Sequence, residues 1–169
     1  MDALSTDLVL MARTLLATAL GFAIGWERER HGSPAGDRTY AMIALGSAAF
    51  TAVGVDSFPA TAEKLIAGVV TGVGFLGAGV IMRTGSGEVR GLTTAASIWA
   101  VAAVGVIVGA GDYIMGTVIA MLIMLLLSWE QLPLLRRIGH PRRRESAREE
   151  NEAALIPSTN VPDADERSK

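Results

Sequence analysis

Residues 92–110 read LTTAASIWAVAAVGVIVGA, a run without a charged side chain. A helix rises about 1.5 Å per residue, so about 20 apolar residues cross the ~30 Å hydrocarbon core of a membrane. Four more apolar stretches lie within the first 130 residues, and Tyr40–Val55 is marginal in length: Leu8–Gly25, Tyr40–Val55, Leu65–Met82 and Tyr113–Trp129. The pattern predicts an all-α, polytopic transmembrane helix bundle with five spans.

The basic residues set the orientation of these spans. If the N-terminus is outside, the inner segments are 26–39, 83–91 and 130–169, and they hold every Lys and Arg except Arg13 and Lys64. The positive-inside rule then places the N-terminus outside and the C-terminus in the cytoplasm. The short outer segments hold one basic residue, Lys64, and five acidic residues, which predict an acidic outer face: Asp2, Asp7, Asp56, Glu63 and Asp112.

Composition narrows the classes of function. The chain has a formal net charge of −2 and no cysteine, so it has no disulfide, thiolate nucleophile or cysteine metal site. The sequence shows no nucleophile–base pair, His-rich metal motif or phosphate-binding loop. It therefore predicts no enzymatic activity, no cofactor and no nucleic-acid partner. The N-terminus lacks the basic region and cleavage site of a signal peptide, so Leu8–Gly25 is predicted to be a retained span.

The chain divides by composition into two parts. Residues 1–135 form the predicted transmembrane domain, and residues 136–169 form a cytoplasmic tail that begins basic and ends polar. The tail has few apolar anchors, so it is predicted to be disordered. Its basic cluster favours the anionic lipids of the inner leaflet: Arg136, Arg137, Arg142, Arg143 and Arg144.

Arg13 is a charged residue inside the first predicted span. A charge in the membrane interior costs several kcal/mol unless it is paired, hydrated or close enough to the interface to snorkel. Arg13 is therefore predicted to face the bundle or a wet cavity. Pairing with Asp7 or Asp112, attraction of an anion and snorkelling to the outer interface remain alternatives.

Small residues spaced three or four apart let transmembrane helices approach closely. Gly21 and Gly25 form such a face on the first span, and the pairs Gly68/Gly72 and Gly105/Gly109 repeat the spacing. Packing within the bundle is the favoured interpretation, and a dimer interface is the alternative. The third span is predicted to make a tight crossing, or else to be a broken helix that lines a cavity, because it is rich in glycine: Gly68, Gly72, Gly74, Gly77 and Gly79.

Two loops on the predicted cytoplasmic side are rich in polar residues. Residues 26–39 read WERERHGSPAGDRT, and residues 83–94 read RTGSGEVRGLTT. The second loop could cradle an anion, but an ordinary turn with Thr93 or Thr94 as helix N-cap is favoured. Unpaired charges at a low-dielectric boundary are costly, so both loops are predicted to form one polar site, as an ion-paired clamp, a ligand or partner surface, or both: Glu27, Arg28, Asp37, Arg38, Thr39, Arg90, Thr93 and Thr94.

Three stretches resemble the signatures of the MgtC/SapB family of bacterial membrane proteins. They are LGFAIGWERE with AGDRTY at residues 20–29 and 35–40, GVGFLGAGVI at 72–81, and RGLTTAASIW at 90–99. The resemblance implies a multi-pass protein of the bacterial inner membrane, linked to growth under magnesium limitation and to survival inside host cells. Some members are described as inhibiting the proton-translocating ATP synthase, which implies a membrane protein partner, and others carry a magnesium-transport label.

Two features depart from the family pattern. Asp37 stands where many members have an apolar residue, and the tail is too short and polar for the folded cytoplasmic domain that some members carry. Residues and resemblance together predict a non-enzymatic regulator that acts through a membrane partner, with the oligomeric state left open. A magnesium or other cation transporter is the alternative, because one or two carboxylates at a pore mouth can hold hydrated Mg²⁺. Against it, no carboxylate lies deep within a span, where pathway charges usually occur.

Overall fold

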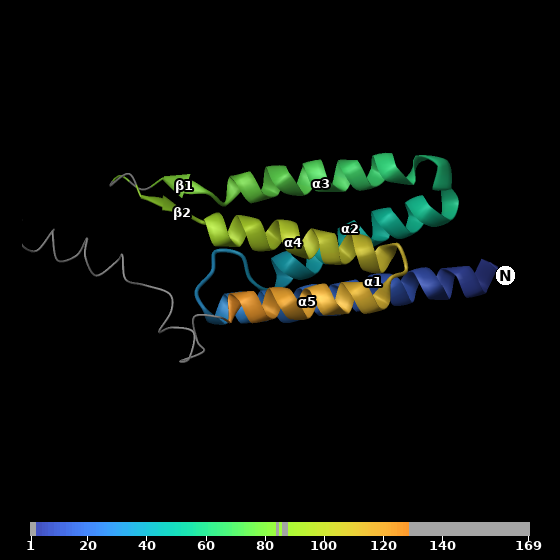
Figure 1. Cartoon of the computed structure of the whole chain (residues 1–169), viewed down its shortest axis with the longest axis horizontal. Helices are drawn as coiled ribbons and strands as arrows, with labels where there is room; N and C mark the ends of the chain where they lie inside the picture. Colours follow the sequence, from blue (N-terminus) through green and yellow to red (C-terminus); the bar gives the residue numbers. More distant parts are fainter. Residues whose placement is uncertain (1–2, 84, 86–87, 129–169) are drawn as a thin grey trace, which may run out of the picture. The chain divides into compact units, whose positions relative to one another are not determined.

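The protein folds into five α-helices and one short hairpin (Figure 1) in a computed structural model that describes residues 3–83, 85 and 88–128. The all-helical architecture predicted from the sequence is confirmed. The helices, with a 3₁₀ turn η1 after the second, are α1 (Ala3–Arg30), α2 (Asp37–Ser57), η1 (Pro59–Thr61), α3 (Ala62–Gly79), α4 (Leu92–Gly109) and α5 (Tyr113–Leu127). The predicted tail, its basic cluster and Trp129 lie outside the described residues.

A two-stranded hairpin that the sequence did not predict joins α3 to α4. Strands β1 (Met82–Arg83) and β2 (Val89–Arg90) pair antiparallel, with Met82 opposite Arg90. Gly91 follows the hairpin with a φ of +91° and is the N-cap residue of α4, without a side-chain cap. The predicted cap by Thr93 or Thr94 is therefore wrong, because the hairpin turns the chain at Gly91 before either threonine is reached.

Four of the helical segments are long and apolar enough to cross a membrane: Leu4–Arg30, Asp37–Ser57, Pro59–Gly79 and Leu92–Gly109. Helix α5 is a shorter apolar helix of 15 residues, which corresponds to about 22 Å. Helix α2 is longer than the marginal stretch Tyr40–Val55, because it begins at Asp37 and continues to Ser57.

Successive helices run in opposite directions (Figure 1). Side-chain contacts fix this arrangement at both ends of the bundle. At one end Ser33 contacts Thr94, at the start of α4, and Ser128, at the end of α5, contacts Glu27 of α1. At the other end Arg13 of α1 reaches the last residue of α4, Gly109. Helix α5 therefore runs parallel to α1, as five alternating passes require.

The orientation of the bundle in the membrane is tested by reporter fusions. The distribution of basic residues predicts that reporters fused after Asp2, Gly85, Asp112 and Arg144 lie outside, inside, outside and inside. Alkaline phosphatase, which is active outside, and green fluorescent protein, which fluoresces inside, should give complementary signals at all four points. Equal signals at the first and last points would place both ends on one side and contradict five spans.

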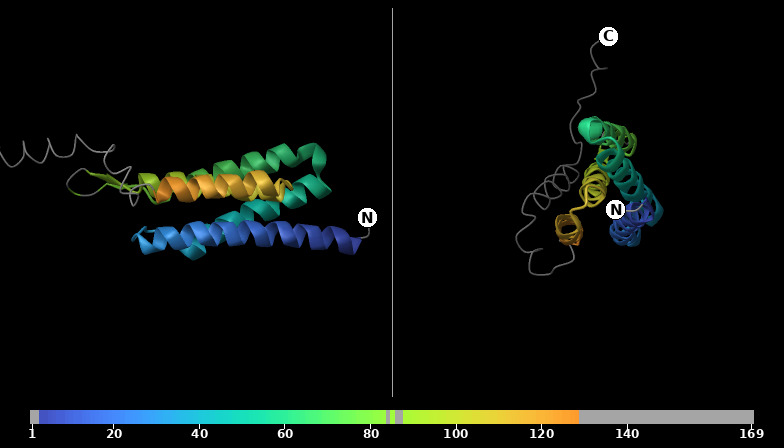
Figure 2. Two further views of the ribbon diagram at one scale, coloured as in Figure 1. Left: turned by 60° about the horizontal axis from the view of Figure 1, so that its bottom comes forward. Right: turned by 90° about the vertical axis from the view of Figure 1, so that its right-hand side faces the viewer.

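Helices α2 and α4 lie between α1 and α3, as Figure 2 shows, and form the centre of the core. Close approach depends on small residues. A Cβ at Gly21 of α1 would lie 2.6 Å from the Ala44 Cβ of α2, and a Cβ at Gly105 of α4 would lie 2.5 Å from the Ala44 carbonyl oxygen. Gly25 and Gly109 make equally close contacts with α2. These four glycines therefore allow α1 and α4 to pack backbone to backbone against α2.

Helix α3 does not make the predicted tight crossing, nor is it broken. It is continuous from Ala62 to Gly79, and its buried residues are Val73 and Gly77. A Cβ at Gly77 would make ordinary contact with Ala95 of α4, at 3.5 Å or more. The other glycines of α3 have no atom of a neighbouring helix within 4 Å of a Cβ position: Gly68, Gly72, Gly74 and Gly79. The same glycine spacing thus serves packing in α4 and leaves one side of α3 open.

Candidate functional site

A buried chain of hydroxyl groups joins the first loop, α2 and α4. Tyr40 is fully buried, and its hydroxyl lies 2.5 Å from the Ser97 Oγ. Ser97 donates to the Thr94 carbonyl at 3.0 Å, and the Thr94 Oγ1 lies 3.2 Å from the Ser33 Oγ of the first loop. Since the single hydroxyl proton of Ser97 goes to Thr94, the Tyr40 hydroxyl must donate to Ser97. Thr94 is the predicted site residue that connects the loops.

Removing the Tyr40 hydroxyl is expected to destabilise the fold. In the Tyr40→Phe variant the buried Ser97 oxygen loses its donor, which should lower the free energy of unfolding by about 1 kcal/mol. Thermal unfolding of the purified protein in detergent measures the change. Tyr113→Phe is the matched control, because Tyr113 is exposed and its hydroxyl makes a contact of 3.4 Å. An equal loss in both variants would contradict the buried chain.

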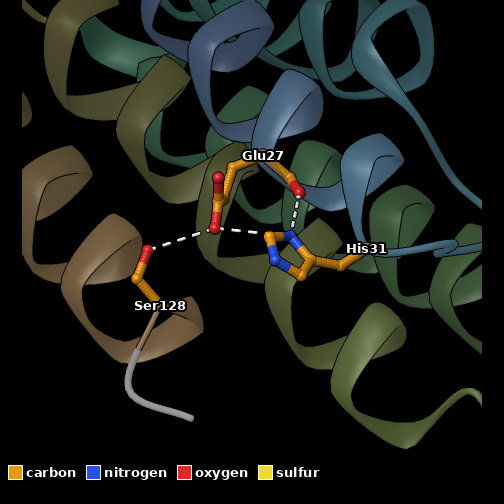
Figure 3. Close-up of polar contacts among 3 residues, drawn as sticks. All are labelled: Glu27, His31 and Ser128. Atoms are coloured by element: carbon orange, nitrogen blue, oxygen red, sulfur yellow. Dashed lines mark hydrogen bonds and ion pairs between the residues drawn. The ribbon is translucent and has the colours of Figure 1, made fainter. Parts of the chain in front are cut away.

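Glu27 ties the end of α1 to the end of α5 (Figure 3). Its carboxylate lies 3.4 Å from the His31 Nδ1 and accepts a hydrogen bond from the Ser128 hydroxyl at 3.2 Å. The i,i+4 spacing of Glu27 and His31 on a helix favours such a contact and can be seen in the sequence. The contact with Ser128 spans 101 residues and has no local signal.

Glu29 caps the second helix, a role that the sequence did not reveal. Its carboxylate accepts a hydrogen bond from the backbone N–H of Asp37 at 3.1 Å, whereas Gly36 at the N-cap has no side chain to offer. A negative charge at a helix N-terminus is favourable because it opposes the positive end of the helix dipole. The Asp37 carboxylate adds a second negative group and accepts from the Arg38 N–H.

The charged residues do not form the ion-paired clamp predicted between the loops. Within the described part of the chain, the ion pair of Arg90 is with Glu88 at 3.0 Å, on the hairpin, and both side chains are exposed. Arg38 is exposed, and so is Thr93. An exposed arginine keeps its hydration, so an ion pair with a residue of the other loop would stabilise it little. Arg90 therefore pairs with Glu88, two residues away in the hairpin.

Arg28 and Thr39 complete the predicted set. The Arg28 Nε is buried and has no hydrogen-bond partner among the described residues. Thr39 is half-buried and lines a groove beside α2. Of the eight predicted residues, the structure therefore joins Thr94 to the first loop, ties Glu27 to α5, and leaves Arg38, Arg90 and Thr93 on the surface. In the described residues no group of three His, Cys, Asp or Glu side chains could hold a metal ion.

Arg13 faces the bundle, where it caps a helix. Its Nη1 donates to the Gly109 carbonyl at 3.1 Å, and its Nε lies 3.4 Å from the Tyr113 hydroxyl. A cation at a helix C-terminus is stabilised by the free carbonyl groups and the dipole. Pairing with Asp112 is not observed, because the Asp112 carboxylate accepts instead from the Met115 N–H and caps α5.

An apolar groove lies between α2 and α3. It encloses about 870 Å³, and Ile98 of α4 contributes to its lining. Thr39, Ser47 and Lys64 are the polar side chains among its lining residues. Gly46 of α2 and Gly68 and Gly72 of α3 leave space along it. We refer to this feature as the α2–α3 groove.

The apolar helices, the buried hydroxyl chain and the intramembrane arginine define a multi-pass helical membrane protein. A family model described as the MgtC family matches residues 14–132. The chain therefore belongs to the MgtC family, as the three sequence stretches predicted.

Named relatives agree with this assignment. Protein SrpB of Synechococcus elongatus is 40% identical, over 91% of this chain and 89% of SrpB. Protein SapB of Bacillus subtilis is 39% identical over 77% of this chain, and Protein MgtC of Salmonella typhimurium is 46% identical over 59%. The matched regions cover 60% of SapB and 42% of MgtC, so this chain spans about half the length of those two relatives. No solved structure matches the chain.

Proposed function

We propose that the protein is a non-enzymatic regulator of the bacterial inner membrane that binds a membrane protein partner and supports growth under magnesium limitation. The observation that carries the proposal is an uncovered side of α3, which we call the α3 outer face. Its residues are small, exposed, and spaced four, three and four apart: Ala67, Thr71, Gly74 and Ala78.

Small residues on a lipid-facing helix gain little from contact with lipid chains, but they allow a second helix to approach closely. The Thr71 hydroxyl already donates to the Ala67 carbonyl at 2.9 Å, so an approaching helix would meet no unsatisfied polar group. A transmembrane helix of a partner fits such a face. The family resemblance makes a subunit of the proton-translocating ATP synthase the first partner to test.

The transporter alternative has less support in the geometry. Charged residues that line ion pathways usually lie within the spans. The charged residue inside the first predicted span, Leu8–Gly25, is Arg13, which donates a hydrogen bond to the end of α4. An arginine would repel a divalent cation. The acidic residues near the predicted outer ends of the helices remain the feature that favours transport: Asp56, Glu63 and Asp112.

The experiment compares the wild type with Gly74→Leu in cells and in purified form. Gly74 is open, so the variant should fold and reach the membrane at normal abundance, but its side chain would block an approaching helix. We expect Gly74→Leu to lose growth in low magnesium and to lose binding to purified ATP synthase in vesicles. Ala19→Leu, at an exposed position of α1, is the matched control and should keep both.

Two results would contradict the proposal. One is normal growth of Gly74→Leu in low magnesium. The other is magnesium flux into vesicles that contain this protein alone, at a rate that Gly74→Leu does not change, which would favour the transporter.

A further inference from the structure

The α2–α3 groove is open along its length, and the charged residue in its lining is Lys64, at one end; Asp56 and Glu63 lie near this end but are not among the lining residues. Because α2 and α3 are antiparallel, Phe50, Lys64 and Leu65 line one end, and Thr39 and Val80 line the other. The stretch of α3 from Lys64 to Val80 corresponds to about 24 Å. No atom of another helix comes within 4 Å of a Cβ position at Gly46, Gly68 or Gly72. The α2–α3 groove is thus long and apolar, and it lies on the side of the helix bundle.

Lys64 is the charged residue in the lining of the α2–α3 groove. It is exposed, it lies in the first turn of α3, and no ion pair engages it among the described residues. From Lys64 toward Val80 the lining of the groove is apolar apart from Ser47 and Thr39. A phospholipid has a phosphate group at one end and acyl chains beyond it. The groove has the matching arrangement, with a cation near the start of α3 and an apolar lining within the span.

We propose that the α2–α3 groove binds one phospholipid, with its phosphate on the Lys64 ammonium and an acyl chain along the groove between α2 and α3. A second copy is the competing occupant, because it carries Glu63 beside its own Lys64 and can bring a carboxylate to this depth. Every phospholipid carries its phosphate at the interface, directly above its chains. The site is separate from the α3 outer face, because Gly74 is not among the lining residues.

Native mass spectrometry of the protein purified in mild detergent tests the acyl part of the site. We expect the wild type to retain one phospholipid per protomer. Gly72→Leu and Gly46→Leu fill the groove and should lower the retained fraction about tenfold. Gly74→Leu adds the same side chain to α3 outside the groove and should retain lipid as the wild type does. Loss of lipid in Gly74→Leu as well would contradict the site.

A second measurement tests the phosphate contact and does not depend on filling the groove. Protein stripped of lipid is offered phosphatidylglycerol or diacylglycerol, which has the same chains but no phosphate. The wild type and Lys64→Arg should prefer phosphatidylglycerol about fivefold, and Lys64→Gln should lose this preference. The wild type, Lys64→Arg and Lys64→Gln have the same glycines along the groove. This measurement therefore remains valid even if Gly72→Leu or Gly46→Leu folds poorly.

Three results would overturn the proposal. They are a wild-type protein that retains no phospholipid, equal preference for both lipids in wild type and Lys64→Gln, and a dimer that Gly72→Leu dissociates without any change in bound lipid. Partner binding is tested separately by Gly74→Leu, so failure of the proposed function and failure of this site give different results.

Discussion

Replacing Gly105 with leucine is expected to remove most of the folded protein from the membrane. A Cβ at this position would lie 2.5 Å from the Ala44 carbonyl oxygen and 2.7 Å from the Ser47 Cβ. Ala44 is fully buried between α1 and α4, so its backbone has no room to retreat. A Cβ at Gly109 would meet the Ala48 carbonyl oxygen at the same distance of 2.5 Å. Both positions therefore exclude any side chain.

The size of the effect follows from the packing. Inserting extra carbon atoms into a well-packed core costs about 1–3 kcal/mol, and sometimes more, so even Gly105→Ala should lower the unfolding temperature. Membrane abundance and thermal unfolding in detergent measure the loss. Gly74→Leu is the matched control, because no neighbouring atom lies within 4 Å of its Cβ position. Equal abundance of the two leucine variants would mean that α4 does not pack as closely on α2 as described.

Replacing Arg13 with leucine is expected to give the second largest loss of stability. The Gly109 carbonyl would lose its donor, and an unsatisfied buried acceptor costs about 1–3 kcal/mol. The favourable interaction of a cation with the C-terminus of α4 would also disappear. Gly111 beside it adopts a φ of +100°, and a Cβ there would lie 3.1 Å from the Arg13 guanidinium, so the turn after α4 is built around this side chain.

Arg13→Lys separates charge from hydrogen bonding. Lysine keeps a cation at the end of α4 but lacks the planar fork that lets arginine contact Gly109 and Tyr113 together. Its unfolding temperature should lie between those of the wild type and Arg13→Leu. If Arg13→Leu unfolds at the wild-type temperature, Arg13 is not a structural cap. If growth in low magnesium is then lost, the role of Arg13 lies in function instead.

The helices could be predicted because their apolar lengths match the membrane, a constraint that every span must meet. The residues at which the helices end were harder to predict. Helix α1 continues through charged residues to Arg30, since a helix can extend beyond the hydrocarbon once its side chains are solvated. The hairpin could not be predicted, because strands of two residues are too short to show an alternating pattern in the sequence. Neither difference alters the number of helices.

The candidate site was harder to predict because sequence spacing does not say which faces meet. Gly68/Gly72 and Gly105/Gly109 have the same spacing, yet the second pair contacts α2 and the first pair does not. The charges of the two loops suggested mutual pairing, but Arg90 pairs with Glu88 nearby. The buried partners of the loops are hydroxyl groups at Tyr40, Ser97 and Thr94, which no charge pattern indicates.

The unequal burial of the helices has a consequence for local stability. Helix α3 has two buried residues, whereas α2 has eight. In lipid the hydrophobic effect adds little between helices, so the free energy needed to detach a helix depends on its close packing against the others, and proteins open first where such contacts are fewest. Helix α3 should therefore leave the bundle before α1, α2 and α4 separate. In hydrogen exchange, its amides should follow a partial opening, while those of α2 should wait for the unfolding of the whole bundle.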